Sequence, residues 1–283
     1  MPASPSRLIA FQGAPGAYSD LACRHAFPEM QTLPCTQFED AFAAVREGAA
    51  ALGMIPIENS VAGRVADIHH LMPDSGLFII GEHFEPVHHH LLAPPGATLA
   101  SIRTVRSHVH ALGQCRDFIR RNGFVPVVAV DTAGAAAELA ERSDAGTAAI
   151  ASELAGKIYG LASLAANIED AAHNTTRFLV MSPVEKRAPR GRPTVTTFVF
   201  NVRNVPAALY KALGGFATNA VNMTKLESYM VGGNFTATQF YADVEAHPDD
   251  WPLKLALEEL EFFSTEVNIL GVYPAAPQRA TAA

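Results

Sequence analysis

Short apolar runs alternate over residues 7–184 with stretches whose apolar residues recur at helical spacing. The first run, Arg7–Gln12, leads through a glycine-containing turn into a helix expected from about Tyr18 to Ala26. Strands that alternate with helices in this way favour a mostly parallel sheet with helices on its faces. The pattern therefore predicts an α/β fold.

The same order of strand and helix recurs along this region. Further strands are expected at Thr32–Cys35, Ala51–Ile57, Thr104–Ser107, Val125–Val130, Ala148–Ala151 and Ala162–Ile168, and one long strand at Glu82–His90. Further helices are expected at Gln37–Gly48, Ile68–Met72, Ala111–Asn122, Ala133–Arg142 and Glu153–Tyr159.

Polar residues collect where the predicted strands end. They are Ser19, Glu58-Asn59-Ser60, Ser107-His108 and Thr132. In open α/β sheets ligands bind at this edge, and the N–H groups at helix starts favour an anion. For any single one of these residues, N-capping of a helix is the commoner explanation. Together they indicate a site for a small carboxylate.

The densest polar segment is Asn174-Thr175-Thr176-Arg177-Phe178, which precedes the apolar run Leu179–Met181. In a strand, Asn174 and Thr176 share one face while Thr175 and Arg177 share the other. Near a turn, Thr176 and Arg177 reach one anion: arginine offers a planar fork and threonine a hydroxyl that donates or accepts a proton. A polar loop that enters a strand is the plainer interpretation.

From Thr194 the pattern changes to strand, helix, two strands, helix and strand. The expected elements are Thr194–Val202, a helix from Asn204-Val205-Pro206 to about Asn219, Asn222–Met230, Phe235–Val244, a helix from Asp249-Asp250 to Phe263, and Val267–Val272. The two central strands are joined through Gly232-Gly233-Asn234. This βαββαβ order predicts a ferredoxin-like unit. The tail is expected to be disordered.

Composition narrows the class of protein. Of the 283 residues, 49% are hydrophobic and 17% charged, and the net charge of -7 argues against non-specific binding to nucleic acid. No apolar run reaches the length of a membrane span. The three cysteines form no C-x-x-C pair, which is typical of free thiols in a reducing compartment. A soluble cytoplasmic protein is expected.

Two segments admit a second interpretation. In the strand Glu82–His90, His88 and His90 share a face and form a zinc site if His83 or Glu85 joins them. A solvated or cleft-crossing strand is the favoured alternative, because no third ligand has convincing spacing. The segment Ser182–Pro193 is rich in Pro, Lys and Arg and is expected to be a linker, with a basic docking patch as the alternative.

In its motifs the chain resembles a bacterial prephenate dehydratase with a C-terminal ACT domain, over nearly its whole length. The matching segments are FQGAPGAYS (Phe11–Ser19), PIENSVAG (Pro56–Gly63), SHVHALGQC (Ser107–Cys115), DTAGAAAEL (Asp131–Leu139), NTTRF (Asn174–Phe178), LYKALGGFA and TKLES.

This resemblance implies a catalytic domain over residues 1–184, with two lobes like a type II periplasmic binding protein and the active site between them. The lobes cover approximately 7–80 with 160–184, and 81–159. A linker at 185–193, a regulatory ACT domain at 194–274 and a disordered tail at 275–283 follow.

The reaction implied is dehydration with decarboxylation of prephenate to phenylpyruvate. Thr176 is expected to donate a hydrogen bond or proton to the departing hydroxyl and Arg177 to clamp a carboxylate, while positioning and desolvation supply much of the rest. The resemblance assigns catalysis to Thr176, Arg177 and Glu58, and substrate binding to Ser19, Asn59, Ser60, Ser107, Gln114, Thr132, Asn174 and Phe178. No metal or organic cofactor is expected.

The ACT-like part implies an L-phenylalanine sensor at a dimer interface, in a homodimer or homotetramer. The positions implied are Asn204, Pro206, Ala207, Ala208, Leu209, Glu227 and Ser228. The chain departs from the family pattern where Ala207 replaces a glycine and where Tyr229-Met230 replaces arginine and proline, so altered regulation is expected.

Three rival functions remain open at this stage. An arogenate dehydratase has the same fold and an amine in its substrate. A non-catalytic sensor that binds an amino acid or carboxylate has the same lobes, although the Thr176-Arg177 pair argues against it. A metal hydrolase built on the histidine strand is the most distant of the three.

Overall fold

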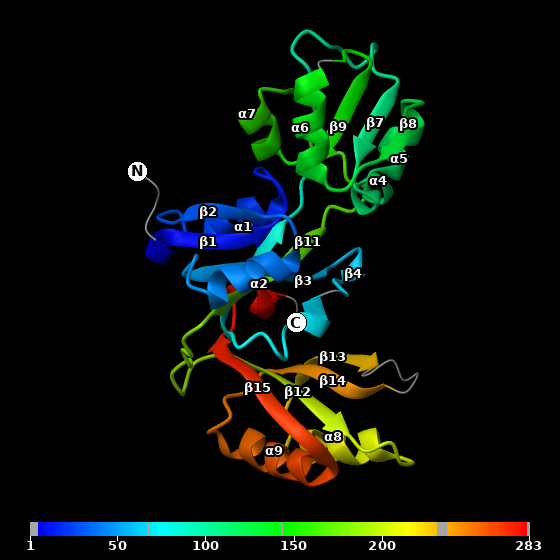
Figure 1. The fold of residues 1–283 in the computed structure, drawn as a ribbon. Coiled ribbons are helices and arrows are strands. Elements are labelled where there is room, and N and C mark those ends of the chain that lie inside the picture. The colour runs from blue at the N-terminus through cyan, green and yellow to red at the C-terminus, as the bar shows by residue number, and fades with distance from the viewer. Residues whose placement is uncertain (1–4, 67, 143, 231–236, 282–283) are drawn as a thin grey trace. The chain divides into compact units, whose positions relative to one another are not determined.

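The computed structural model describes residues 5–66, 68–142, 144–230 and 237–281 (Figure 1). The chain divides into two compact units, Met1–Val65 with His83–Phe178 and Ala66–Glu82 with Leu179–Ala283. Two strands, β5 (Phe78–Pro86) and β11 (Thr175–Ser182), run from one unit into the other.

The first sheet of the first unit is built on β1 (Leu8–Gln12), which lies parallel to both β2 (Gln31–Cys35) and β3 (Leu52–Asn59). β11 lies on the other side of β3, and β4 (Gly63–Arg64) pairs antiparallel with the end of β3. The helices of this region are α1 (Tyr18–Ala26) and α2 (Phe38–Arg46), preceded at the start of the chain by the 3-10 turn η1 (Pro5–Arg7). The middle of β1 is fully buried, as its apolar run requires.

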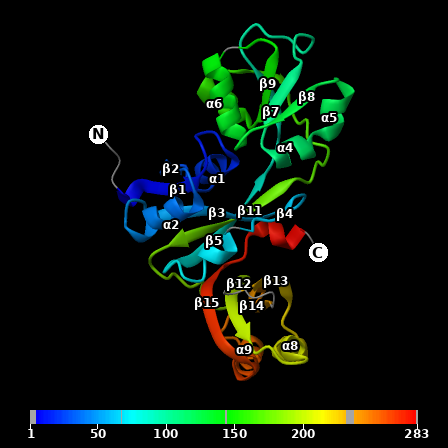
Figure 2. The same cartoon turned by 45° about the vertical axis from the view of Figure 1, so that its right-hand side comes forward.

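The second sheet of the first unit has the strand order β10-β6-β9-β7-β8. Its strands are β6 (His90–Ala93), β7 (Thr104–Ser107), β8 (Val125–Val128), β9 (Thr147–Ala151) and β10 (Ala162–Ala165). The helices α4 (Val109–Gln114), α5 (Arg116–Arg121) and α6 (Thr132–Arg142) lie around this sheet (Figure 2). The helix α7 (Glu153–Tyr159) lies beside α6 (Figure 1). β7 is parallel to β8 and β9, whereas β6 is antiparallel to β9 and β10. The expected α/β alternation is confirmed here, whereas only two of the four strand pairs of this sheet are parallel.

Two expected elements are interrupted. The helix expected over Ala111–Asn122 is two helices, because Cys115 leaves the helical region with φ -117° and ψ 25°. The long strand expected over Glu82–His90 ends at Pro86, which has no N–H to continue a ladder, and a new strand begins at His90. His88 and His89 lie in the short segment between these two strands.

The second unit contains the βαββαβ order predicted from the sequence. Its elements are β12 (Thr194–Val202), α8 (Ala208–Thr218), β13 (Met223–Met230), β14 (Ala237–Val244), α9 (Trp251–Phe263) and β15 (Ser264–Pro274). All neighbours in the sheet order β13-β14-β12-β15 are antiparallel, which confirms the ferredoxin-like prediction. The predicted connection Gly232-Gly233-Asn234 lies outside the described residues.

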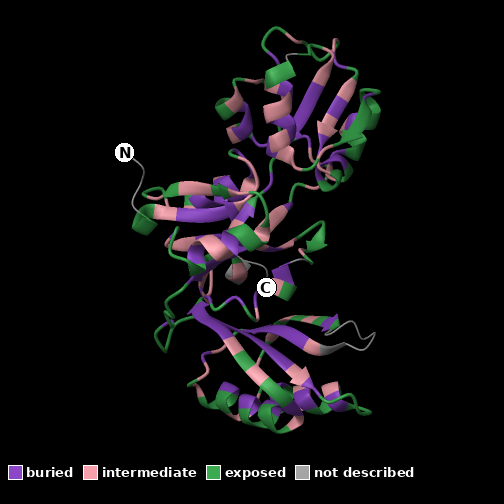
Figure 3. Ribbon diagram, in the orientation of Figure 1, coloured by how far each residue is buried: buried purple, intermediate pink, exposed green. Residues whose placement is uncertain are grey.

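The core of this unit lies between the sheet and one face of α8 and α9 (Figure 3). Phe198 and Phe200 from β12, Phe216 from α8 and Leu253 and Leu260 from α9 are all buried in it. Burial of such side chains stabilises a fold by roughly 1.5–3 kcal/mol each. The unit also includes α3 (Ile68–Leu71) and the parallel contact of β5 with β15 at Ile79 and Gly271.

The C-terminal tail is ordered further than its sequence predicts. Residues Pro277–Thr281 form the 3-10 turn η2. The Arg279 guanidinium donates to both carboxylate oxygens of Glu82, at 2.7 and 2.9 Å, and the Glu82 side chain is fully buried. A buried carboxylate requires such a partner. The expected disorder of residues 275–283 is therefore corrected as far as Thr281.

Candidate active site

The centre of the site is a contact between Asn59, the last residue of β3, and Thr176 in β11. The amide Nδ2 of Asn59 donates to Thr176 Oγ1 at 3.0 Å and to Asn174 Oδ1 at 2.8 Å. The Oδ1 of Asn59 accepts from the backbone N–H groups of Val61 and Ala62, at 2.9 and 2.8 Å. Those two donors fix which end of the amide faces Thr176.

This contact sets the direction in which Thr176 can donate. A threonine hydroxyl carries one proton and two lone pairs, and one lone pair accepts from Asn59. The hydroxyl proton therefore points elsewhere and is available to a ligand. The neighbouring Asn174 is 2% exposed, and within the described residues its Nδ2 has no hydrogen-bond partner. A buried N–H donor beside a hydroxyl donor is suited to a ligand rich in oxygen.

Arg177 lies on a different face of β11. Its Nη1 donates to Glu58 Oε1 at 2.8 Å, and its side chain is 4% exposed against 33% for Glu58. Since side chains alternate along both strands, the Glu58–Arg177 pair and the Asn59–Thr176 pair occupy opposite faces. The hypothesis that Thr176 and Arg177 grip one anion is therefore not supported by this arrangement, in which the arginine fork faces Glu58.

A chain of hydrogen bonds extends from Asn59 away from Thr176. Gln114 Nε2 lies 3.4 Å from Asn59 Oδ1, and Gln114 Oε1 lies 2.9 Å from His89 Nε2. The other ring nitrogen of His89, Nδ1, is 2.9 Å from the hydroxyl of Tyr18, which also donates to the backbone carbonyl of His88 at 2.7 Å. Burial lowers the pKa of His89, against the raising effect of the Gln114 hydrogen bond.

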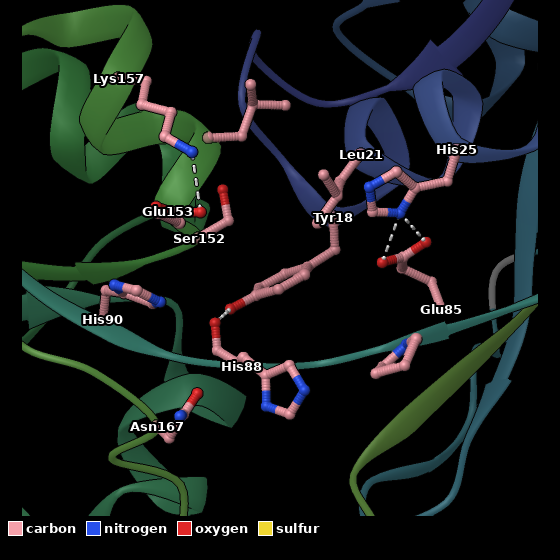
Figure 4. Close-up of a pocket in the computed structure, with 12 residues that line it drawn as sticks. Tyr18, Leu21, His25, Glu85, His88, His90, Ser152, Glu153, Lys157 and Asn167 are labelled. Atoms are coloured by element: carbon pink, nitrogen blue, oxygen red, sulfur yellow. Dashed lines mark hydrogen bonds and ion pairs between the residues drawn. The ribbon is translucent and has the colours of Figure 1, made fainter. Parts of the chain in front are cut away.

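Tyr18 also lines a pocket with a volume of about 540 Å³ (Figure 4). The side chains around it are Tyr18, Leu21, His25, Glu85, Pro86, His88, His90, Ser152, Glu153, Leu154, Lys157 and Asn167. None of Asn59, Gln114 and Thr176 lines it. Tyr18 is the residue that this pocket shares with the hydrogen-bonded chain through His89 and Gln114 to Asn59.

The expected histidine strand does not assemble a metal site in the part of the chain that the structure describes. Glu85 accepts from His25 Nδ1 at 3.0 Å and contacts His83 Nε2 at 2.9 Å, and Glu85 itself is buried. No group of three or more His, Cys, Asp or Glu residues among the described positions is arranged to hold a metal ion. The two imidazoles therefore serve as hydrogen-bond partners of the buried Glu85 carboxylate.

A model of the family described as prephenate dehydratase matches residues 9–186. That span includes every element of the site described above. The chain belongs to the prephenate dehydratase family.

Similar proteins cover nearly the whole of this prephenate dehydratase chain. A bifunctional N-acyl-homoserine lactone acylase/prephenate dehydratase of Komagataeibacter europaeus is 55% identical over 96% of this chain and 98% of its own. An arogenate dehydratase/prephenate dehydratase of Arabidopsis thaliana is 40% identical over 94% of this chain and 71% of its own.

Solved structures agree with the family. GqqA, described as a novel type of quorum-quenching acylase, is 55% identical with a TM-score of 0.91 over 96% of this chain and 100% of its own. A prephenate dehydratase from Arthrobacter aurescens in complex with L-Phe is 31% identical with a TM-score of 0.87 over 95% of this chain and 90% of its own. The predicted fold class, a prephenate dehydratase region with a C-terminal regulatory-type unit, is confirmed.

Several motif residues of this prephenate dehydratase hold the backbone in place. Ser60 Oγ donates to the His173 carbonyl at 2.9 Å and accepts from the Thr175 N–H at 3.0 Å, so it ties β11 to the end of β3. Ser107 is fully buried and donates to the Ile150 carbonyl at 2.5 Å. Phe178 is 1% exposed and packs in the interior.

Acidic side chains bind backbone N–H groups at the starts of α1 and α6. Asp131 Oδ1 accepts from the Gly134 N–H at 2.6 Å, and the buried Asp20 accepts from the Gly16 N–H at 2.8 Å. Asp131 therefore caps α6. Asp20 lies within α1 and binds the loop that precedes this helix, whose N-cap residue Ala17 has no side-chain cap. Ser19 and Thr132 stand in the first turns of α1 and α6 and take no part in the Asn59–Thr176 network.

Sequence reasoning did not select Tyr18 or His89 as site residues. Tyr18 stands beside Ser19 in a motif that was recognised, so its place in that motif was the available signal. His89 stands in a run of three histidines, and only the break between β5 and β6 turns its ring toward Gln114.

No helix in the described part of the chain is long and apolar enough to cross a membrane, and Cys23, Cys35 and Cys115 are free thiols.

Proposed function

We propose that this chain catalyses the decarboxylating dehydration of prephenate to phenylpyruvate, carbon dioxide and water. The observation that carries this proposal is the Asn59–Thr176 hydrogen bond, in which the threonine oxygen accepts and its proton points away from Asn59. The segments that bear both residues lie within the part of the chain that matches the family. Family membership supports the reaction, and this hydrogen bond supports Thr176 as the proton donor.

In this mechanism Thr176 donates its proton to the hydroxyl that leaves the substrate ring. The bond from the ring carbon to that oxygen breaks, and the electron pair of the bond to the ring carboxylate moves into the ring as carbon dioxide departs. The negative charge that grows on Thr176 Oγ1 is stabilised by the Asn59 N–H, and a proton from solvent then restores the hydroxyl. Because the product ring is aromatic, the enzyme needs chiefly to orient the diene and to hold the donor.

Positioned proton donation typically contributes roughly 10²–10⁴-fold. Threonine is a weak acid, so desolvation and orientation supply the remainder. Asn174, through its buried Nδ2, is the second donor that we assign to the substrate. We assign Arg177 to Glu58, so that the pair holds the ends of β3 and β11 in register, in place of the direct clamp that the sequence suggested.

The remaining residues of the family motifs are proposed to position or border the site. Gln114 positions Asn59, and Ser60 positions β11. Ser19 and Thr132 are proposed to border the substrate, and Ser107 and Phe178 to support the site from the interior. The test is to offer the purified protein prephenate and arogenate side by side and to follow the aromatic product. Turnover of arogenate alone would favour the rival dehydratase, and turnover of neither would favour a sensor.

For the C-terminal region we propose an L-phenylalanine sensor over residues 194–274, after a linker at 185–193 and a catalytic domain at 1–184. The related Arthrobacter protein was solved in complex with L-Phe. The ligand positions proposed are Asn204, Pro206, Ala207, Ala208, Leu209, Glu227 and Ser228. Ala207 has φ 62°, a left-handed conformation that glycine adopts without strain.

We also propose that this unit assembles the chain into a homodimer or homotetramer. Large apolar side chains are exposed on it, among them Tyr210 at 81%, Trp251 at 68% and Phe262 at 75%. Such exposure favours a partner surface. A sedimentation measurement that finds only monomer would contradict this. The free cysteines are in keeping with a cytoplasmic location.

A second candidate function is hydrolysis of N-acyl-homoserine lactones. The Komagataeibacter europaeus relative has this activity in its name beside prephenate dehydratase, and it is 55% identical over almost the whole chain. The pocket of about 540 Å³, which the dehydratase mechanism does not use, is the observation in this structure that favours it. Release of homoserine lactone from an N-acylated lactone tests this function directly.

A further inference from the structure

His88 lines the pocket of about 540 Å³ (Figure 4), and its imidazole pairs with the carboxylate of Glu169, a residue outside the lining that the dehydratase reaction leaves unused. His88 Nδ1 lies 2.9 Å from Glu169 Oε1, and the other carboxylate oxygen accepts from the His89 N–H at 2.9 Å. The Glu169 side chain is 4% exposed, whereas that of His88 is 54% exposed. A buried carboxylate thus holds an accessible imidazole.

This geometry fixes the tautomer of His88. The Glu169 carboxylate only accepts hydrogen bonds when it is ionised, so the proton of a neutral His88 ring stands on Nδ1. Burial alone would raise the pKa of Glu169, but hydrogen bonds from His88 and from the backbone of His89 outweigh it and hold that pKa below its usual range. The free Nε2 of His88 is then a base, as in hydrolases that pair a histidine with a carboxylate.

The surrounding side chains match an acylated amine. Leu21, Pro86 and Leu154 provide apolar surface for an acyl chain, and Lys157 and Asn167 provide hydrogen-bond donors for an oxyanion. Asn167 has φ 52°, in the left-handed region that non-glycine residues seldom adopt. Backbone strain of this kind is concentrated at functional sites.

We propose that this pocket hydrolyses N-acylated amines, with His88 as the general base and Glu169 as the positioning residue. Water is the nucleophile: its oxygen bonds to the acyl carbon while its proton passes to His88 Nε2. The carbon–nitrogen bond then breaks, and His88 returns the proton to the amine nitrogen. The products are a carboxylic acid and a free amine, so atoms and charges balance without any further reactant.

Tyr18 connects this pocket to the other site. Its hydroxyl donates to the backbone carbonyl of His88 at 2.7 Å and lies 2.9 Å from Nδ1 of the His89 ring. Tyr18 therefore holds the backbone of His88, and it is also the last member of the series of hydrogen bonds that begins at Thr176. The two reactions therefore use different side chains within one unit of the fold. This assignment rests on the second candidate function proposed above.

The experiment measures both activities of the full-length protein and of the variant His88→Asn. Substrates are an N-acyl-homoserine lactone, with the free amine as readout, and prephenate. Loss of the general base is expected to lower hydrolysis by roughly 10²-fold or more, with prephenate turnover retained as evidence that the fold is intact. His70→Asn, which changes an exposed histidine outside the pocket, is the matched control and is expected to leave both activities unchanged.

Two further measurements separate catalysis from structure. Glu169→Gln is expected to lower kcat for hydrolysis with little change in KM, because the ring loses its orientation and the pocket keeps its walls. Saturating prephenate is expected to leave the KM of the acyl substrate unchanged. Hydrolysis by His88→Asn at the wild-type rate, or competition by prephenate, would overturn this assignment alone. If the wild-type protein does not hydrolyse the acyl substrate, both the second candidate function and the assignment of His88 and Glu169 are overturned. The dehydratase proposal would still stand.

Discussion

Asn59 Nδ2 lies 3.0 Å from Thr176 Oγ1, although 117 positions separate the two residues in the chain. The contact exists because β3 and β11 are neighbours in one sheet, with Asn59 as the last residue of β3 and Thr176 near the start of β11. The amide of Asn59 is itself held by two backbone N–H groups, so the hydroxyl of Thr176 meets a preformed donor. Preformed donors of this kind stabilise charge without reorganisation.

Replacing Asn59 by aspartate should therefore impair catalysis more than folding. The new carboxylate still accepts hydrogen bonds from the Val61 and Ala62 N–H groups. It has no N–H to donate to Thr176 Oγ1, however, and instead accepts a hydrogen bond from the Thr176 hydroxyl, whose proton is then no longer directed at the substrate. We expect kcat for prephenate to fall by roughly 10²-fold or more. Steady-state kinetics measure this, and Asn122→Asp, the same change at the exposed end of α5, is the control. Equal kcat values for the two variants would refute the role of Asn59.

The Glu58–Arg177 pair makes a different prediction. If Arg177 serves Glu58, Arg177→Met and Glu58→Gln should be coupled in stability, with a coupling free energy of about 1–3 kcal/mol in a double-mutant cycle. Denaturant unfolding of the two single variants and the double variant measures it. A cycle without coupling, combined with a large rise in the KM for prephenate in Arg177→Met, would restore the direct carboxylate clamp.

His89 should make stability depend on pH. Burial lowers its pKa in the folded protein, so the unfolded chain binds the proton more readily. The neutral ring's contribution is present above the unfolded pKa of about 6.5 and is lost as pH falls toward the lowered folded value. The melting temperature of the wild type should fall between pH 7 and pH 5 more steeply than that of His89→Gln. Parallel curves for the two proteins would contradict this.

Ala207 offers a test in the C-terminal unit. Its φ of 62° strains an alanine by about 1 kcal/mol, so Ala207→Gly should raise the free energy of unfolding by a similar amount. We also expect tighter binding of L-phenylalanine, because a methyl group is removed where the ligand is proposed to approach. Ala220, with φ 55°, is the matched control: Ala220→Gly should stabilise the protein in the same way without changing the affinity for phenylalanine. A glycine at 207 that leaves calorimetric binding unchanged would argue against that ligand position.

Much of the fold follows from local pattern. The bounds of α1 match the expected Tyr18–Ala26, and the βαββαβ order of the second unit was evident from its sequence. Strand alternation also separates Thr176 from Arg177, and the structure keeps that separation. The idea that a turn brings them together was wrong, because β11 begins at Thr175, before either residue.

Other features depend on contacts distant in sequence and could not be predicted. The order of the tail comes from Arg279 meeting the buried Glu82, 197 positions away. The position of His89 depends on the interruption after Pro86 and on Gln114 from another helix. The pairing of His88 with Glu169 joins residues 81 positions apart, and spacing along the chain gives no sign of it.

The most direct test of the account compares Thr176→Ala with Thr176→Ser in prephenate turnover. The alanine variant lacks the donor, so its kcat should fall by roughly 10²–10⁴-fold, whereas serine keeps the hydroxyl beside Asn59 and should retain most of the activity. Both variants should melt close to the wild type. Near-normal turnover by Thr176→Ala would contradict the central claim that this hydroxyl donates to the departing group.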